Sequence, residues 1–352
     1  MSAEGKGKRL LLVYEDQALA SSRIRMLELA PHLEALGFLC ETAPYPSGPF
    51  ALRSLLRRSA EADGIVLQKK LPSIRDAWIW RRRRAPLIFD FDDAIMYRQE
   101  PRAGTHRSRT RDRRFAGIRR LADAFVCGND YLASFCHETG KPILVSPSPV
   151  PLDVPVAHRR KLGSSARIGW IGSRGNLASL RTLAPVFRRL AEKREFELVV
   201  ISDASLDLPG VPIEHIPWSL ATQERELARL DIGVMPLHET PWTLGKCAYK
   251  VQQYMAAALA VVASPVGVNA QLIVDGENGL LSSGEREWLS ALVRLVDDPG
   301  LAARLGAAGR KTVVEQHGFS HTARSWENFL ATVLRKRLSD SPGPTGNSWR
   351  NP

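Results

Sequence analysis

The sequence has no apolar run long enough to cross a bilayer, and cysteine is scarce. A membrane-spanning helix needs about 20 consecutive apolar residues, and no stretch of the 352 residues reaches that length. The opening letters MSAEGKGKR lack the apolar core of a secretory signal. The four cysteines, at positions 40, 127, 136 and 247, form no C-x-x-C pair and have no histidine at zinc-binding spacing. We therefore expect a cytoplasmic protein with reduced thiols.

Acidic residues are outnumbered, with 37 against 49 lysines and arginines, which gives a net charge of +12. Nine arginines lie between Arg98 and Arg120, with Glu100 and Asp112 as the only acids, and four more form the run 81–84. Such clusters suit nucleic acid, an anionic membrane surface or a phosphorylated substrate, although a solvated surface has the same composition. Phe115 is the only aromatic in the block, so no nucleic acid is expected. We predict peripheral docking at the inner face of the membrane.

Short apolar runs alternate with amphipathic helical patterns on both sides of the proline-rich stretch 146–155. The predicted strands are residues 9–14, 64–67, 87–91, 124–127 and 143–145 before that stretch, and 167–171, 198–201, 213–216, 232–235 and 260–263 after it. Such alternation predicts parallel sheets covered by helices. Because 352 residues are many for one core, we expect an α/β protein of two Rossmann-like, doubly wound domains facing a cleft.

The proline-rich stretch is predicted to be the linker between these domains. The N-terminal domain then covers residues 1–150 and the C-terminal domain residues 156–320. A last helix, residues 321–338, is expected to cross back to the N-terminal domain, and the tail 339–352 to be disordered.

Two further helices are predicted from apolar residues that recur at helical spacing. One covers residues 23–36, and Ser21 and Ser22 are natural N-caps for it. The other covers residues 177–191.

Two segments of the C-terminal half carry signals for a phosphate site. The strand 260–263 ends at Ser264, and open α/β sheets bind ligands beyond the carboxyl ends of their strands. Lys246 and Lys250 are four residues apart and share one helix face, where they either contact phosphate or are solvated. The turn 172–176 lies between a strand and a helix, where backbone N–H groups attract phosphate. It matches neither G-x-G-x-x-G nor the P-loop, so an ordinary turn is the alternative.

The sequence Asp90-Phe91-Asp92-Asp93 follows a strand of the N-terminal half. Carboxylates in that position can hold Mg²⁺ or Mn²⁺ in a metal-dependent transferase or phosphatase. They lie in the first domain, whereas the phosphate signals lie in the second, so we expect no metal and interpret one aspartate as orienting an acceptor or capping a helix. Two residues have paired interpretations: Trp218 flanks a base or belongs to the core, and His106 approaches the cleft or is solvent-exposed.

Four segments of the C-terminal half, in this order, are similar to a known family: IGWIGSRGN (168–176), DIGVMPL (231–237), QYMAAALAVVASPVG (253–267) and DGENGLL (275–281). Over roughly residues 165–330 their order and spacing resemble the group 1 glycosyltransferases, which are retaining, use sugar nucleotides and have the two-domain GT-B fold. In the N-terminal half, ASSRIRMLELAPHLEALGF and FDFDDAI resemble a subgroup of that family, in which the second motif faces the interdomain cleft.

The resemblance implies transfer of a sugar from a nucleoside diphosphate-sugar to a glycan or lipid-linked acceptor, with retention and without a metal or other cofactor. The C-terminal domain would hold the donor and the N-terminal domain the acceptor. Cationic groups stabilise a departing diphosphate, and the catalytic residues expected are Lys246, Lys250 and Arg174. The donor-binding residues expected are Gly172, Ser173, Asn176, Trp218, Gln253, Val266 and Gly267, and those on the acceptor side are Ser22, Arg23, Asp92 and Asp93.

The sequence departs from the family pattern at two places. The family has two glutamates eight positions apart, and the matching positions here are Gly245 and Gln253. The amide of Gln253 can still bind a ribose hydroxyl. The family's arginine and lysine after the first strand of the C-terminal domain are not in register, and only Arg174 lies near. A second hypothesis therefore stays open: a non-catalytic GT-B protein that binds a nucleotide or glycan and recruits partners.

Overall fold

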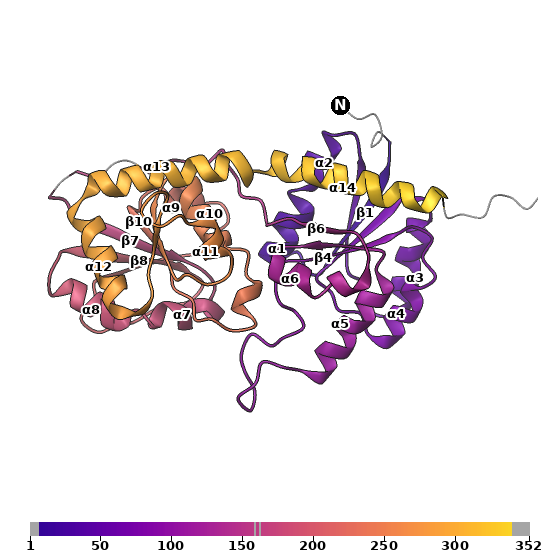
Figure 1. Ribbon diagram of the computed structural model, residues 1–352, viewed down its shortest axis with the longest axis horizontal. Coiled ribbons are helices and arrows are strands. Elements are labelled where there is room, and N and C mark those ends of the chain that lie inside the picture. Colours follow the sequence, from indigo (N-terminus) through magenta and orange to yellow (C-terminus); the bar gives the residue numbers. More distant parts are fainter. Residues whose placement is uncertain (1–6, 158–159, 162, 340–352) are drawn as a thin grey trace, which may run out of the picture.

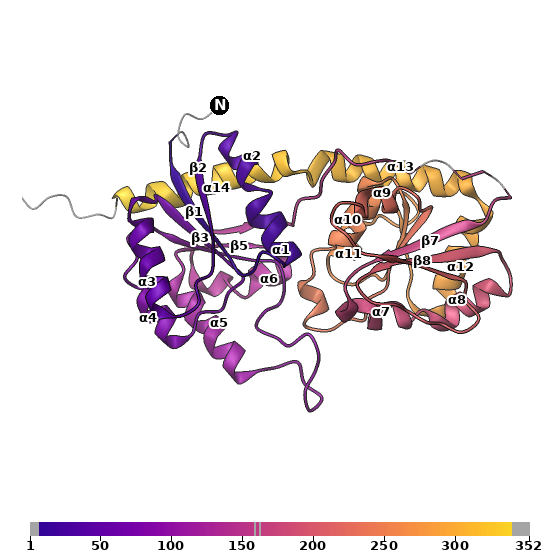
Figure 2. The ribbon, with the colours of Figure 1, turned by 180° about the vertical axis from the view of Figure 1, so that it is seen from behind.

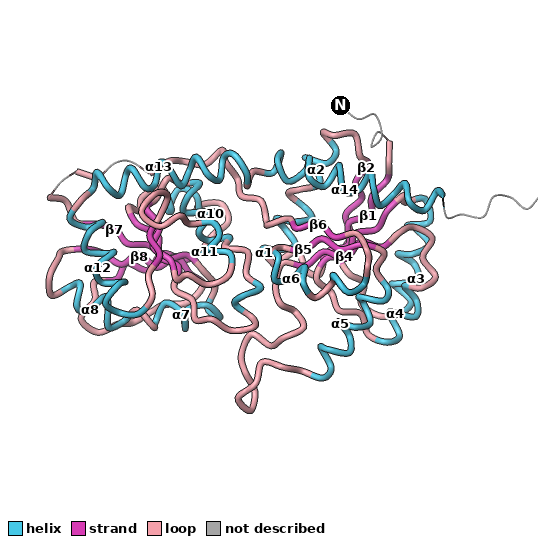
Figure 3. Tube along the Cα trace, in the orientation of Figure 1, coloured by secondary structure: helices cyan, strands magenta, loops and turns pink. Residues whose placement is uncertain are grey.

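The chain folds into two α/β domains that lie side by side (Figure 1). The computed structural model describes residues 7–157, 160–161 and 163–339. Each domain contains one six-stranded sheet whose strands all pair in parallel, and helices flank both sheets (Figure 3). The predicted fold class is confirmed. From residue 340 onward, the tail predicted to be disordered lies outside the described residues.

The N-terminal sheet has the strand order β2-β1-β3-β4-β5-β6. Its strands are β1 (Arg9–Tyr14), β2 (Leu39–Pro44), β3 (Gly64–Gln68), β4 (Leu87–Phe91), β5 (Ala124–Cys127) and β6 (Ile143–Val145). The C-terminal sheet has the order β12-β11-β10-β7-β8-β9. Its strands are β7 (Ala166–Ile171), β8 (Phe196–Ser202), β9 (Ile213–Pro217), β10 (Ile232–Met235), β11 (Ala260–Ala263) and β12 (Leu280–Leu281).

The helices of the N-terminal domain are short except for α5. They are α1 (Ala20–Ser22), the π-helical η1 (Arg23–Leu27), α2 (Ala30–Glu34), α3 (Pro49–Arg58), η2 (Ser59–Glu61), α4 (Ile74–Trp80), α5 (Arg109–Leu121), α6 (Asp130–Ser134) and η3 (His137–Thr139). The second half contains η4 (Arg174–Asn176), α7 (Leu177–Arg181), α8 (Ala184–Ala191), α9 (Gln223–Leu227), η5 (Thr243–Gly245), α10 (Tyr249–Ala256), α11 (Val268–Leu272), α12 (Gly284–Asp297), α13 (Pro299–Gln316) and α14 (Phe319–Ser339). Within the described ranges, no helix is both long and apolar enough to cross a membrane.

All ten predicted strands are present, with ends within two residues of the predicted ones. Two strands have no counterpart in the prediction, and both lie at sheet edges. β2 has the sequence LCETAP and only Ala43 among its residues is buried, so it has no continuous apolar run. β12 is two residues long. β2 is a largely exposed edge strand and β12 is too short to show a pattern, so neither has the continuous apolar run that marks a buried strand.

Both predicted helices are interrupted, and in each case a proline gives the reason. The helix predicted at 23–36 is divided into η1 and α2, and the break lies at Pro31, which has no N–H to donate to the carbonyl of Leu27. The helix predicted at 177–191 is divided into α7 and α8, because Pro185 likewise leaves the carbonyl of Arg181 without its donor. Ser21 and Ser22 lie inside α1 and cap nothing with their side chains, so the N-cap prediction was wrong.

A buried ion pair connects η1, β4 and the interdomain linker. Arg25 is 2% exposed and Asp90 is fully buried, and Arg25 Nε lies 2.9 Å from Asp90 Oδ2. Arg25 Nη1 also donates to the carbonyl of Ser146 at 2.9 Å and to Ser148 Oγ at 3.3 Å. Burial alone would lower the pKa of Arg25, but the charge and hydrogen bonds of Asp90 raise it above the ordinary value. The guanidinium therefore stays charged and fixes the start of the linker.

The chain crosses between the domains twice, and the two crossings lie together. The first is the linker and the second is the joint between α13 and α14, where Val150 donates its N–H to the carbonyl of His317 at 2.8 Å and bridges Gly318. Figure 2 shows α13 along the C-terminal domain and α14 along the N-terminal one. Trp326 and Leu330 of α14 are buried in the N-terminal core, and Trp326 Nε1 donates to Ser146 Oγ at 3.2 Å.

Breaking the buried pair from one side should be costly. We expect Arg25→Met to lower the free energy of unfolding by about 3–5 kcal/mol, because it leaves the Asp90 carboxylate buried without its partner. The double variant Arg25→Met/Asp90→Leu should lose clearly less, because it removes both charges. The control is Arg9→Met in the exposed pair Arg9–Glu61, which should cost at most about 1 kcal/mol. Chemical denaturation measures all three, and equal losses for the single and double variants would contradict the assignment.

Candidate active site in the interdomain cleft

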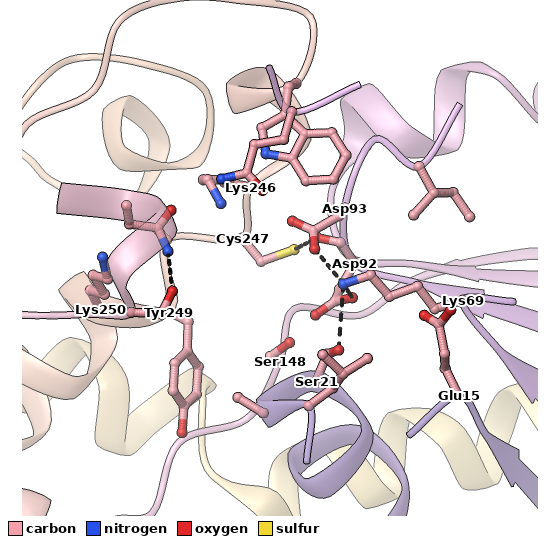
Figure 4. Close-up of a pocket in the computed structure, with 18 of the residues that line it drawn as sticks. Glu15, Ser21, Lys69, Asp92, Asp93, Ser148, Lys246, Cys247, Tyr249 and Lys250 are labelled. Carbon is pink, nitrogen blue, oxygen red and sulfur yellow. Dashed lines mark hydrogen bonds and ion pairs between the residues drawn. The ribbon is translucent and has the colours of Figure 1, made fainter. Parts of the chain in front are cut away.

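A cleft of about 840 Å³ lies between the two domains at the carboxyl ends of both sheets. Figure 4 shows its two sides: Lys246 and Lys250 extend from the C-terminal domain, and Asp92, Asp93 and Lys69 extend from the N-terminal domain. Open parallel sheets bind ligands at this position. Both domains therefore supply charged groups to one cavity.

The two lysines of the C-terminal domain are placed by the start of α10. Ala248 has a left-handed backbone, φ 53°, immediately before the helix. Lys250 Nζ lies 4.2 Å from the centre of the Trp170 ring, a cation–π contact. A side chain at Gly172 would place its Cβ 2.5 Å from Lys250 Nζ, so the glycine makes room for the ammonium group. The structure thus places Lys246, Lys250 and the turn at Gly172 near one another. The two lysines do not share one helix face as predicted, because Lys246 has an extended backbone (ψ 142°) and precedes α10.

Neither lysine has an anionic partner among the described residues. Burial, and to a smaller extent the charge of Lys246, lowers the pKa of Lys250 to about 7. A partly buried ammonium without a counter-ion is unfavourable in the empty protein. An anion in the cleft would supply the missing charge, so the site can bind a phosphate or diphosphate.

The N-terminal side of the cleft contains two carboxylates that follow β4. Lys69 Nζ forms an ion pair with Asp93 and lies 3.4 Å from Asp92 Oδ1 and 3.4 Å from Ser21 Oγ. Burial works against the charge of Asp92, but Lys69 and Arg25 hold the pKa of its carboxyl below the ordinary value. The Oδ1 atom of Asp92 is buried, with Lys69 as its neighbour and no hydrogen bond within the described structure. Both carboxylates line the cleft, so Asp92 and Asp93 can accept hydrogen bonds from a substrate hydroxyl there.

Lys69 occupies the position between the two carboxylates. Its backbone has φ 60°, which is strained for a residue with a side chain. Over the ranges that the structure describes, no group of three or more histidine, cysteine, aspartate or glutamate side chains is arranged to hold a metal ion. Metal independence itself stays a prediction.

The segment 244–247 touches the N-terminal domain directly. Asn129 Nδ2 donates to the carbonyls of Leu244 and Lys246, each at 3.1 Å, and Cys247 Sγ donates to the carbonyl of Asp92 at 3.2 Å. A Cβ at Gly245 would lie 2.6 Å from the backbone nitrogen of Ala94. Gly245 stands where the resembled family has its first glutamate, and this contact leaves no room for a side chain there.

Eight of the fourteen predicted site residues do not line the cleft, among them Gln253, Trp218, Arg174 and Ser22. Gln253 lies on α10 facing a separate small cavity beside the linker, lined also by Val150 and Glu224. Trp218 is 43% exposed, and its Nε1 donates to Gln223. Arg174 is exposed. Ser22 is fully buried, and its hydroxyl donates to Gln68 Oε1 at 3.0 Å. The roles predicted for these four residues are not supported by their positions.

The other predicted site residues also fall into two groups, those that line the cleft and those that do not. Ser173, Asn176, Asp92 and Asp93 line the cleft together with Lys246 and Lys250. Arg23 instead pairs with Glu28, and Val266 and Gly267 lie beside η5 rather than on the cleft wall. His106 lies in the loop before α5, where its Nδ1 is 2.8 Å from the carbonyl of Arg98.

Several cleft residues had no place in the sequence-based prediction, above all Lys69, Trp170 and Cys247. Lys69 follows β3 directly, at the same sheet edge as the aspartates after β4. The rule that ligands bind beyond strand ends could therefore have found it. Trp170 belongs to an apolar strand and Cys247 precedes Ala248, and nothing in the pattern around either residue separates it from core residues.

Comparison with known proteins agrees with this architecture. The chain resembles solved structures of a sucrose-phosphate synthase from Thermosynechococcus elongatus (TM-score 0.72, 14% identity, covering 95% of this chain and all of that one), and of Anabaena HepE in complex with UDP and glucose (TM-score 0.68, 13% identity, 92% and 100%). A glycosyltransferase from Rickettsia africae matches similarly (TM-score 0.68, 14% identity, 95% and 100%). The fold is therefore the GT-B fold of glycosyltransferases.

Comparison at the level of sequence gives two further matches. Residues 165–298, which lie in the C-terminal domain, match the family model described as glycosyl transferases group 1. An alpha-maltose-1-phosphate synthase from Mycolicibacterium smegmatis is 38% identical over 77 residues, which make up 20% of each chain. The match thus spans one fifth of that relative's length.

We expect the charged Lys250 side chain to lower the free energy of unfolding of the protein when the cleft is empty. The pKa of Lys250 in the folded state, about 7, lies below its unfolded value of about 10.4, so the unfolded state binds the proton more tightly. The penalty is complete below pH 7 and disappears as the pH rises towards 10.4. We expect Lys250→Met to stabilise the protein by about 1–3 kcal/mol at pH 6 and by much less at pH 10. Thermal unfolding measures this, with the exposed Lys193→Met as control; no gain at pH 6 would contradict it.

Proposed function

We propose that the protein transfers a sugar from a nucleoside diphosphate-sugar to an acceptor. The observation that carries this proposal is the pair Lys246 and Lys250, which faces the cleft without an anionic partner among the described side chains. A diphosphate has the charge and the oxygens to satisfy both ammonium groups. The solved HepE structures contain UDP or UDP-glucose, which supports a nucleotide-sugar donor.

The proposed reaction is metal-independent and retains the anomeric configuration. The bond between the anomeric carbon and the diphosphate oxygen breaks, and Lys246 and Lys250 stabilise the charge that develops on that oxygen. The acceptor hydroxyl attacks from the same face, and its proton passes to the departing phosphate oxygen. Asp92 and Asp93 orient the acceptor, since both carboxylates line the cleft on the N-terminal side.

A non-catalytic nucleotide-binding protein is the second candidate function. It is favoured because neither glutamate of the resembled family is present. Gly245 stands at the first position and contacts Ala94, and Gln253 stands at the second and faces away from the cleft. The two candidates differ in turnover. A panel of UDP-, GDP- and ADP-sugars, assayed for transfer and for slow hydrolysis with the purified protein, separates them. Nucleotide binding without any sugar release would favour the second.

The donor proposal predicts nucleotide binding that depends on Lys250 and on pH. Lys250→Ala should weaken binding of the best nucleoside diphosphate by about 1.5–3 kcal/mol, as expected for lost charge-assisted hydrogen bonds. Since the lysine must be protonated and its pKa in the empty site is about 7, affinity should fall as the pH rises from 6 to 9. Calorimetry in buffers of different ionisation enthalpy should detect proton uptake above pH 7.

The matched control for this measurement is Lys193→Ala, because Lys193 is exposed and lies outside the cleft. It should bind as the native protein does. Unchanged affinity in Lys250→Ala would remove the lysine pair from the donor site.

We further propose that the N-terminal domain docks on an anionic membrane surface, which would place the protein at the inner face of the membrane with a lipid-linked or membrane-proximal acceptor. Exposed arginines of the 98–120 block that do not line the cleft form the basic part of this surface: Arg102, Arg107, Arg109, Arg113 and Arg120. Beside them, on α3 and α4, Phe50 is 81%, Ile74 89% and Trp78 51% exposed. Basic groups beside exposed apolar side chains are typical of an interfacial surface.

Docking of this kind should depend on lipid charge and on salt. Each basic residue near the surface contributes about 1 kcal/mol, and screening acts over about 8 Å at physiological salt. Sedimentation with anionic vesicles should therefore recover the protein at low salt, much less at high salt, and little with neutral vesicles. Arg109→Gln/Arg113→Gln/Arg120→Gln should weaken binding strongly. Equal recovery with both lipid types, or none with either, would contradict the docking proposal.

A further inference from the structure

More cationic than anionic side chains line the cleft, and the cations without an anionic partner lie at two places. Six cationic side chains and three carboxylates line the cavity: Lys69, Lys70, Arg111, Arg114, Lys246 and Lys250 against Glu15, Asp92 and Asp93. Lys69 pairs with both aspartates, and Lys70 Nζ lies 3.3 Å from Glu15 Oε1. Two cation pairs remain without a carboxylate, one in each domain.

The unmatched pair of the N-terminal domain lies in the first turns of α5. Arg111 and Arg114 both line the cleft, as does Thr110, which lies on the same helix face. Arg111 Nη1 donates to the carbonyl of Ile95 at 2.9 Å, which holds the guanidinium group while its other N–H groups stay available. The acid in the first turn, Asp112, is exposed and lies outside the cleft lining.

Ser108, the residue before the helix, gives an independent indication of a ligand. Its side chain lines the cleft although the residue is only 8% exposed. It makes no side-chain capping bond, and its hydroxyl has no hydrogen-bond partner in the described part of the chain. Ser108 is more than nine-tenths buried, and a polar side chain buried to this degree normally has a partner. The 13-residue helix begins directly after it, and the N-terminus of a helix favours negative charge.

We propose that Ser108, Thr110, Arg111 and Arg114 form a second anion site that binds a phosphate group carried by the acceptor. Arginine binds phosphate through two parallel hydrogen bonds, and the serine and threonine hydroxyls supply further donors. The assignment to the acceptor rests on the proposed function, in which Lys246 and Lys250 of the opposite domain hold the donor diphosphate. A single diphosphate matches one cation pair, so the pair on α5 is left for the other substrate.

The site also fixes how such an acceptor lies. Its phosphate would be held at α5, and the carboxylates after β4 lie on the same side of the cleft, at the other end of the loop 92–108. A hydroxyl on the acceptor would then be oriented by Asp92 or Asp93 towards the donor. The acceptor class is therefore a phosphorylated molecule, either a soluble phosphomonoester or a lipid with a phosphate headgroup.

The experiment measures a second anion on protein that already holds a nucleotide. The native protein is saturated with the nucleoside diphosphate that raises its melting temperature most, and then titrated by calorimetry with glycerol 3-phosphate. A parallel arm uses detergent micelles containing phosphatidic acid, with diacylglycerol micelles as the uncharged comparison. Binding in the first arm identifies a soluble acceptor phosphate, and binding in the second arm alone identifies a lipid phosphate. Binding in neither arm overturns the proposal.

The variant Arg111→Gln/Arg114→Gln should weaken this second binding at least tenfold and leave the nucleotide affinity within about twofold. Retained nucleotide binding also shows that the variant is folded. Arg286→Gln/Arg324→Gln removes the same charge from exposed positions outside the cleft and should change neither affinity. An Arg111→Gln/Arg114→Gln variant that binds the phosphate normally, or that loses the nucleotide as well while remaining folded by circular dichroism, overturns the proposal.

The outcomes for the two proposals can be told apart. If the native protein binds no nucleoside diphosphate, the donor proposal fails, and the phosphate titration is then performed on the empty protein. If it binds the nucleotide but no phosphate, only the acceptor subsite fails.

Discussion

The geometry of the cleft depends on one buried ion pair, Arg25–Asp90. Asp90 belongs to β4 and lies two residues before the first cleft carboxylate, whereas Arg25 comes from the π-helical turn η1. The same guanidinium holds the linker through Ser146 and Ser148, and α14 reaches Ser146 through Trp326. Because a buried charge without a partner is so unfavourable, β4, η1, the linker and α14 keep the one arrangement in which this ion pair is formed. The acceptor wall, the linker and the returning helix are thus positioned by the same contact.

The sequence alone was sufficient for the fold and for the core of the donor side. Buried parallel strands are continuous apolar runs, so ten of the twelve strands could be found, whereas β2 alternates with exposed polar residues and could not. Lys246 and Lys250 were predicted for the cleft because their segment leads into a helix near the carboxyl end of a strand, and both line it, although Lys246 lies before the helix rather than on it. Arg25, Lys69 and Ser108 were not predicted, because their roles arise from contacts between residues far apart in the chain. Gln253 was predicted to bind the donor but faces another cavity, because similarity in sequence does not fix which face of a helix meets the ligand.

The absence of the family's first glutamate has a structural explanation at position 245. At position 245 the space that a side chain would fill is taken by the backbone of Ala94, and Asn129 holds the neighbouring carbonyls. The C-terminal domain therefore meets the N-terminal domain through backbone at a point where the resembled family presents a carboxylate. The cations on both sides of the cleft are left uncompensated by that exchange, so negative charge must come from what binds. A protein built this way is less stable when empty than when occupied.

The two chain crossings between the domains have a mechanical consequence. Val150 of the first crossing is hydrogen-bonded to His317 of the second and bridges Gly318, so the domains are joined at one place. Rotation of the domains about that joint would move Lys246 and Lys250 relative to Asp92 and Asp93, because the lysines lie on one domain and the aspartates on the other. Such a rotation would have to break the hydrogen bonds that Asn129 and Cys247 make across the domain boundary. The width of the cleft is therefore coupled to those few contacts.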